Sequence, residues 1–118
     1  MEEPMMKVFD YSVVKAQDVE EGASKTKVRW LITKDTGAEN FAMRLFETGP
    51  GGFSPPHSHP WEHEVYILEG EGEVEGGGEV KAFKPGTVIF IPSEEKHQFR
   101  NTGSRTVKFL CIIPYKKT

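Results

Sequence analysis

Apolar side chains along this chain recur in short runs that have the two-residue period of β-strands. No stretch of ten or more residues has the spacing of a buried helix face, whereas runs rich in Val, Ile, Phe and Tyr alternate with turn residues. The pattern predicts strands over residues 27–33, 40–47, the stretch carrying His57 and His59, 63–75, 79–83, 87–92, 97–101 and 106–115. Eight short strands favour an all-β barrel or sandwich.

Glycine and proline separate these runs, as in "GPGG", "GGG" and "KPG", because they tolerate positive φ or fix φ at turn values. The glycines 76–78 predict a hairpin loop. A length of 118 residues allows one domain. We expect residues 25–118 to form the barrel and residues 1–24 to pair at a sheet edge, exchange with a second subunit or fray.

Composition and charge narrow the range of partners. The net charge of −3 and the scattered lysines and arginines provide no basic surface for nucleic acid. No apolar run is long enough to span a membrane, and "MEEPMMKVFD" lacks the features of a secretory signal. A single cysteine, Cys111, fits a reducing compartment. We therefore expect a cytoplasmic protein that binds neither membranes nor nucleic acid.

The four histidines have the spacing of metal ligands. His57 and His59 are two residues apart, so on a strand they face the same side, and His63 has the same parity. His97 stands where a neighbouring strand begins. Neutral imidazoles bind divalent Zn, Cu, Fe and Ni well, so four converging rings would make a metal site. Any one histidine taken alone is more often a surface or packed residue.

Two segments resemble the two motifs of the cupin superfamily. "GGFSPPHSHPWEHEVYILEG" is similar to the first motif, and "GTVIFIPSEEKHQFRN" is similar to the second. The matching positions are Gly51, His57, His59 and Gly70 in the first motif and Gly86, Pro92, His97 and Asn101 in the second. Glu94 stands where the family usually has glycine. The resemblance implies a single-domain double-stranded β-helix, also called a jelly-roll barrel, and cupins include enzymes, storage proteins and sugar-binding regulators.

The first motif departs from the usual pattern at its acidic ligand. His63 occupies the position where most cupins carry glutamate, and Glu64 is its neighbour. Adjacent strand residues face opposite sides, so only one of the two can enter the barrel. If Val65 and Ile67 face inward, His63 does too, and we favour this register.

"HSHPWEH" resembles small single-domain cupins that hold manganese with four histidines. The resemblance implies that His57, His59, His63 and His97 are the ligands, that the metal is manganese with two open adjacent positions, and that the protein is a homodimer. Affinity alone ranks Cu, Ni and Zn above Mn, so these metals and Fe are alternatives.

These expectations lead to a function hypothesis. We expect a metal-dependent oxidoreductase, similar to a dioxygenase, that acts on a small oxygenated organic substrate. One alternative is a metal-dependent cupin that binds a sugar or carboxylate without catalysis, and another is an isomerase or lyase whose metal polarises a carbonyl. No catalytic residue beyond the metal centre can be named.

The last predicted strand supplies candidate cavity residues. Phe109 and Cys111 alternate with Lys108 and Leu110, and lysine prefers water, so the face with Phe109 and Cys111 is expected to line the barrel. Cys111 is either a buried apolar residue or a thiol near the metal. Arg44 is expected at the surface, with a place inside the barrel beside a substrate carboxylate as the alternative. Asn101 is expected to bond the local backbone.

Overall fold

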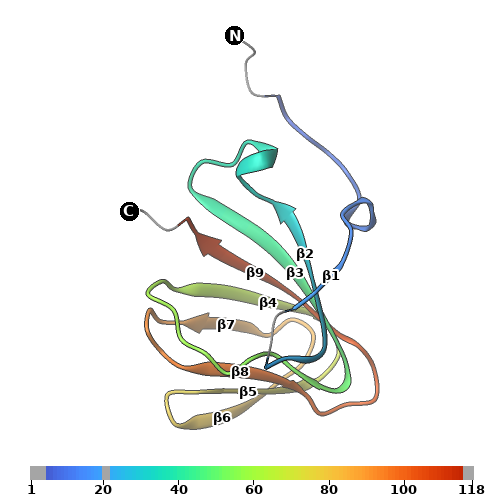
Figure 1. The fold of residues 1–118 in the computed structure, drawn as a ribbon. Helices are drawn as coiled ribbons and strands as arrows, with labels where there is room; N and C mark the ends of the chain where they lie inside the picture. Colours follow the sequence, from blue (N-terminus) through green and yellow to red (C-terminus); the bar gives the residue numbers. More distant parts are fainter. Residues whose placement is uncertain (1–4, 20–21, 116–118) are drawn as a thin grey trace.

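The computed structural model describes residues 5–19 and 22–115, and it shows an antiparallel sheet that curls into a half-open barrel (Figure 1). The strands within this part of the chain are β1 (Gln17–Asp18), β2 (Ser24–Ile32), β3 (Phe41–Phe53), β4 (His63–Glu69), β5 (Gly72–Gly76), β6 (Glu79–Phe83), β7 (Val88–Ile91), β8 (His97–Asn101) and β9 (Val107–Pro114). Two single-turn 3₁₀ helices, η1 (Tyr11–Val13) and η2 (Lys34–Thr36), lie before β1 and after β2. The predicted all-β jelly-roll fold is confirmed.

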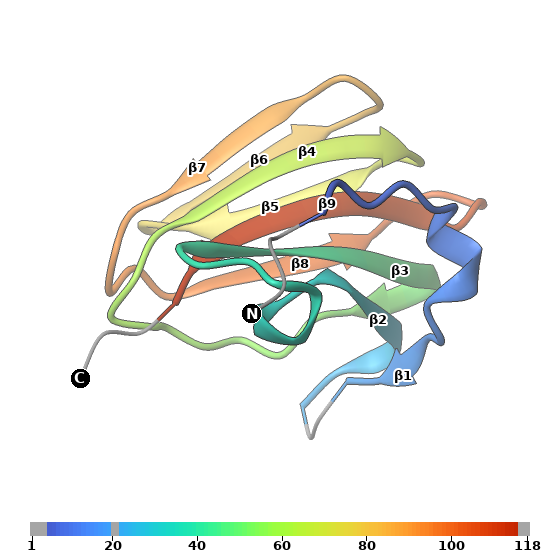
Figure 2. The same cartoon turned by 90° about the horizontal axis from the view of Figure 1, so that it is seen from above.

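The sheet folds into two facing layers. Strands β5, β6 and β8 form one layer, and β1, β2, β3, β9, β4 and β7 form the other (Figure 2). β3 joins them, because it pairs with β9 from Phe41 to Thr48 and then meets β8 where Phe53 pairs with Arg100. This crossing of one long strand between the layers closes the barrel on one side.

Two of the predicted strands were wrong in detail. The run 63–75 is two strands, because the chain turns at Gly70, where φ is +83°. A Cβ at Gly70 would lie 2.7 Å from the Cα of Val107, so the close approach of β9 also requires glycine there. The stretch with His57 and His59 is not a strand, and only His57 forms a bridge, to His97. The glycine hairpin is confirmed, since Gly77 and Gly78 connect β5 to β6 with positive φ.

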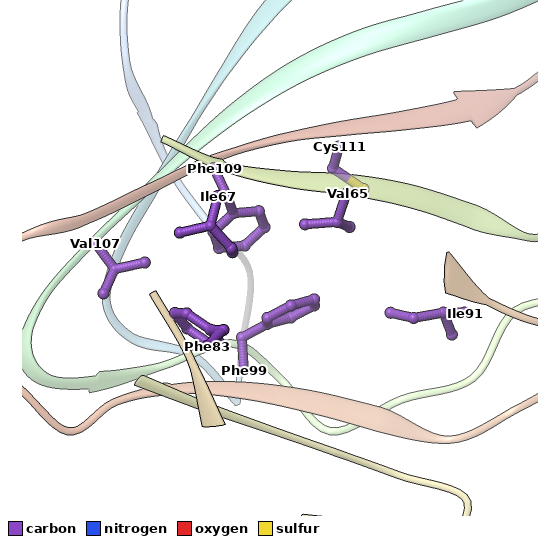
Figure 3. Packing of buried hydrophobic residues seen from close by; sticks show 8 residues of the cluster. All are labelled: Val65, Ile67, Phe83, Ile91, Phe99, Val107, Phe109 and Cys111. Atoms are coloured by element: carbon purple, nitrogen blue, oxygen red, sulfur yellow. The ribbon is translucent and has the colours of Figure 1, made fainter. Parts of the chain in front are cut away.

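The core fills the space between the layers. Its buried side chains come from both of them: Val65, Ile67, Phe83, Ile91, Phe99, Val107, Phe109 and Cys111 (Figure 3). Phe99 of one layer stacks on Phe109 of the other with ring centroids 4.6 Å apart, and Phe46 stacks on the same ring at 5.2 Å. These aromatic contacts join the two layers next to the histidines, since the ring centroids of Phe99 and His97 are 6.2 Å apart.

The N-terminal segment pairs with its own chain where the structure describes it. Gln17 and Asp18 form the edge strand β1 against Val28 and Lys27 of β2. Parts of the predicted segment 1–24 and barrel 25–118, namely residues 1–4, 20–21 and 116–118, lie outside the described residues. Within the described ranges, no helix is long and apolar enough to cross a membrane.

Asn101 ties together the turn that follows β8. Its side-chain amide donates to the carbonyl oxygens of Thr48 (2.9 Å) and Arg105 (2.8 Å), and its Oδ1 accepts from the backbone N–H of Gly103 (2.9 Å). The residue is buried. The local backbone bonds expected from the sequence are therefore present, with an additional bond to β3.

We predict that Asn101→Ala lowers the free energy of unfolding by about 3 kcal/mol, because three hydrogen bonds are lost and buried backbone groups are left unpaired. Urea denaturation followed by circular dichroism measures the change. Thr102→Ala, an exposed neighbour, is the control and should change the stability by less than about 0.5 kcal/mol. Equal stabilities of the two variants would contradict this role for Asn101.

Candidate functional site

A pocket of about 360 Å³ opens between the two layers at the end where the histidines lie. Its volume is within the range of small-molecule sites. The walls carry the aromatic rings of Trp30, Phe46, Trp61, Phe99 and Phe109. The polar side chains that line it include all four histidines, Arg44 and Cys111. The pocket therefore has apolar walls and one group of converging polar residues.

The four imidazoles come together from three parts of the chain. His63 begins β4, His97 begins β8, and His57 and His59 lie in the segment between β3 and β4. Ring centroids are 4.2 Å apart for His57 and His59, 4.7 Å for His63 and His97, 5.3 Å for His59 and His63, and 5.5 Å for His57 and His97. The Nε2 atoms of His57 and His59 are 3.2 Å apart. The structure thus brings together all four histidines singled out by their spacing.

The register of β4 decides between His63 and Glu64. His63 pairs with Ile91 and is only 4% exposed, on the same side of the strand as the core residues Val65 and Ile67. Glu64 pairs with Phe90 on the outer face and is exposed. The imidazole, rather than the carboxylate, faces the pocket.

The loop between β7 and β8 positions two of the rings. Glu94 has a φ of +72°, and its backbone N–H donates to the carbonyl oxygen of His59 at 2.6 Å. Glycine adopts this left-handed conformation most readily, which accounts for the glycine that the motif resemblance led us to expect at this position. The carbonyl oxygen of Glu95 accepts from Nδ1 of His97 at 3.0 Å. With its proton on Nδ1, His97 has the lone pair of Nε2 free.

All four imidazoles are neutral at pH 7. Partial burial, followed by the neighbouring histidines and Arg44, lowers the pKa of His57 to about 4. Burial, again with neighbouring histidines and Arg44, lowers the pKa of His63 to about 3. Burial also lowers the pKa values of His59 and His97. Each ring therefore keeps one nitrogen lone pair, which is the form that binds metal ions.

Convergence of the rings is not by itself a metal centre. Among residues 5–19 and 22–115, no three or more His, Cys, Asp or Glu side chains are arranged so that they already enclose a metal ion. Nδ1 of His63 is buried without a hydrogen-bond partner in the described structure. The site is a cluster of neutral nitrogen donors, one of which is left unpaired.

Phe109 and Cys111 line the pocket, as the alternation of β9 indicated. Both are buried. Burial raises the pKa of the Cys111 thiol more than the nearby Arg44 lowers it. The thiol is therefore protonated at neutral pH, and it takes part in the site as a neutral group.

The expected surface position of Arg44 was wrong. Arg44 faces the pocket, and its Nη2 lies 3.0 Å from the Sγ of Cys111. Glu47, three residues further along β3, pairs with Arg29 at 3.1 Å and Lys108 at 3.8 Å. Residues three apart on a strand face opposite sides, which separates Arg44 from Glu47. The sequence could have indicated the inward position of Arg44, because Arg44 and Phe46 are two residues apart and so face the same side of the strand.

Trp61 also belongs to the site. Its ring stacks on His59 with centroids 4.4 Å apart and an interplanar angle of 5°. It lies in the segment between the first-motif histidines and β4, and it lines the pocket. The stacking limits rotation of the His59 ring.

Residues 44–113 match a family model described as a cupin domain. An oxalate-binding protein from Thermotoga maritima is 34% identical over 96 residues, which are 78% of this chain and 78% of that protein. A 1-methylthio-D-xylulose 5-phosphate methylsulfurylase from Rhodospirillum rubrum is 39% identical over 71 residues, which are 60% of this chain and 46% of that protein. This chain thus aligns with less than half of the methylsulfurylase.

The fold and the sequence both match a solved polyketide cyclase. The structure of RemF from Streptomyces resistomycificus superposes with a TM-score of 0.88 and 41% sequence identity. The match covers 95% of this chain and 81% of that chain.

Proposed function

This chain belongs to the cupin family, and we propose that it binds a divalent metal ion through His57, His59, His63 and His97 and acts there on a small oxygenated organic molecule. The observation that carries the proposal is the convergence of four neutral imidazoles on one pocket with aromatic walls. Small-molecule binding also fits the relatives, which include an oxalate-binding protein and a polyketide cyclase.

The residues present fit a metal ion. Two nitrogens that bind one ion at about 2.1 Å and at a right angle are about 3.0 Å apart, close to the 3.2 Å between the Nε2 atoms of His57 and His59. The buried, unpaired nitrogen of His63 is a group that a ligand would satisfy. Manganese is the metal implied by the resemblance, and iron, nickel, zinc and copper suit imidazole ligands equally well or better.

The environment favours activation of a carbonyl or carboxylate compound. Four neutral ligands leave the double charge of the ion uncompensated, so the ion, when bound, would polarise a carbonyl or stabilise an enolate. The aromatic walls favour a planar apolar body. We therefore favour a non-redox reaction of the isomerase, lyase or cyclase class. The dioxygenase-like reaction predicted from the sequence is the alternative, and it differs because it consumes oxygen.

We predict that His63→Ala retains less than about a tenth of the metal bound by the wild-type protein, because loss of one nitrogen donor weakens the site by several kcal/mol. Glu64→Ala is the matched control, since the neighbouring carboxylate faces outward and its loss should leave the metal content unchanged. Elemental analysis of protein without an affinity tag measures both. Retained metal in His63→Ala with loss in Glu64→Ala would contradict the ligand assignment.

The reaction class is tested with benzoylacetone, an enolisable aromatic dicarbonyl. We predict that manganese-loaded wild-type protein and Glu64→Ala produce the absorption of its enolate without oxygen uptake, and that His63→Ala does not. Absorbance titration and an oxygen electrode provide the two measurements. Oxygen consumption would support the dioxygenase-like reaction instead, and absence of the enolate band from the wild-type protein would contradict carbonyl activation.

We also propose that two copies of the chain form a homodimer through the outer face of β4 and β7. Tyr66 and Val88 are paired neighbours on this face and are 46% and 74% exposed, with Phe90 59% exposed beside them. The N-terminal segment, which extends away from the barrel, exposes Met5 and Met6 almost fully (Figure 1). Each chain thus has an uncovered apolar face and an uncovered apolar segment. In a two-fold symmetric dimer, the segment of one copy would cover the face of the other.

We predict that the wild-type protein has the mass of a dimer in light scattering coupled to gel filtration, and that Phe90→Glu has the mass of a monomer. Burial of a glutamate in an apolar interface without a partner is costly. Val80→Glu, at an exposed apolar position of β6 in the other layer, is the control and should remain dimeric. A monomeric wild-type protein would contradict the proposal.

A further inference from the structure

Arg44 is a cation in the pocket, and within the described part of the chain it forms no ion pair, although Asp18 also lines the pocket. Among the described residues, the ion pairs involve other arginines and lysines, and no Asp or Glu carboxylate lies within 4.0 Å of its guanidinium. Its Nη2 contacts the thiol of Cys111 at 3.0 Å, and its Nε is buried without a hydrogen-bond partner. A thiol is a weak, neutral acceptor, so it leaves the charge of Arg44 uncompensated.

Two aromatic rings hold the guanidinium in place. Its Cζ lies 4.8 Å from the ring centroid of Phe46 and 5.3 Å from that of Trp30. Contacts of this kind orient the planar fork of arginine and reduce the entropy that it loses on binding a ligand. Arg44 is therefore an organised cation without a carboxylate within 4.0 Å among residues 5–19 and 22–115.

The positive charge of Arg44 indicates which kind of ligand fits the pocket. A guanidinium is always protonated, and burying it unpaired is unfavourable unless an anion joins it. The surrounding walls are aromatic, which favours a planar, apolar body over a fully hydrated inorganic anion. The four histidines line the same pocket, so a ligand held at Arg44 has its remaining surface beside them.

We propose that Arg44 anchors the carboxylate of an aromatic or conjugated organic acid in this pocket, with the acid's second oxygen group directed to the histidines. This proposal names the class of ligand for the proposed site, and it rests on the proposed function only for the role of the histidines. Arg44 itself acts as a specificity-determining residue. It would select acids over neutral carbonyl compounds of the same shape, because a neutral ligand leaves the guanidinium unpaired.

Benzoate binding to the metal-free protein tests the anchor without relying on a metal. NMR titration after treatment with EDTA should give a dissociation constant at least about tenfold higher for Arg44→Gln than for the wild-type protein, since a charged hydrogen bond is lost. Arg105→Gln, which removes an exposed arginine, is the matched control and should bind benzoate like the wild-type protein. Unchanged benzoate affinity in Arg44→Gln would overturn the proposal.

A second titration uses only the wild-type protein and so does not depend on the folding of a variant. Benzoate should bind at least about tenfold more tightly than benzamide, which lacks the charge, and more tightly than acetate, which lacks the ring. Equal affinity for benzoate and benzamide would overturn the anchor, and equal affinity for benzoate and acetate would overturn the aromatic ligand class. Failure of the metal assignment would leave these titrations unaffected, because they use metal-free protein.

Discussion

The site depends on a short antiparallel bridge between two segments that are far apart in the sequence. The N–H of His57 donates to the carbonyl oxygen of His97 at 3.3 Å, and the N–H of His97 donates to the carbonyl oxygen of His57 at 3.1 Å. Pro55, Pro56 and Pro60 prevent the segment around His57 from forming a regular strand. The bridge, together with the hydrogen bond from the N–H of Glu94 to the carbonyl oxygen of His59, therefore fixes the positions of His57 and His59 relative to β8.

Burial then determines the chemistry of the converged rings. Because burial and mutual repulsion keep the imidazoles neutral, the cluster provides nitrogen lone pairs rather than positive charge. Arg44 instead brings a fixed positive charge to the pocket, which Asp18 also lines. This separation of neutral donors from one organised cation gives the pocket two different polar groups, and the aromatic walls between the layers define the space that a ligand can fill.

The sequence predicted the parts of the site that follow strand parity. His63 shares parity with Val65 and Ile67, so the register that buries these two residues also brings its ring inside. Phe109 and Cys111 face the pocket for the same reason. Arg44 was assigned to the wrong face because a charged residue was expected at the surface, although its parity with the inward-facing Phe46 indicated otherwise.

The alternation of apolar and polar residues could not predict features that depend on tertiary contacts. The alternation of residues 63–75 continues through Gly70, so only the close approach of β9 reveals the turn there. The histidine segment has strand-like spacing but bonds through a single bridge. The stacking of Trp61 on His59 likewise joins residues whose contact depends on the loop conformation.

Anomalous diffraction from manganese-soaked crystals can show whether the four imidazoles bind one metal ion. We expect a single strong anomalous peak within about 2.0–2.3 Å of one ring nitrogen of each of His57, His59, His63 and His97. Ordered rings with no peak between them, or a peak bound by other residues, would contradict it.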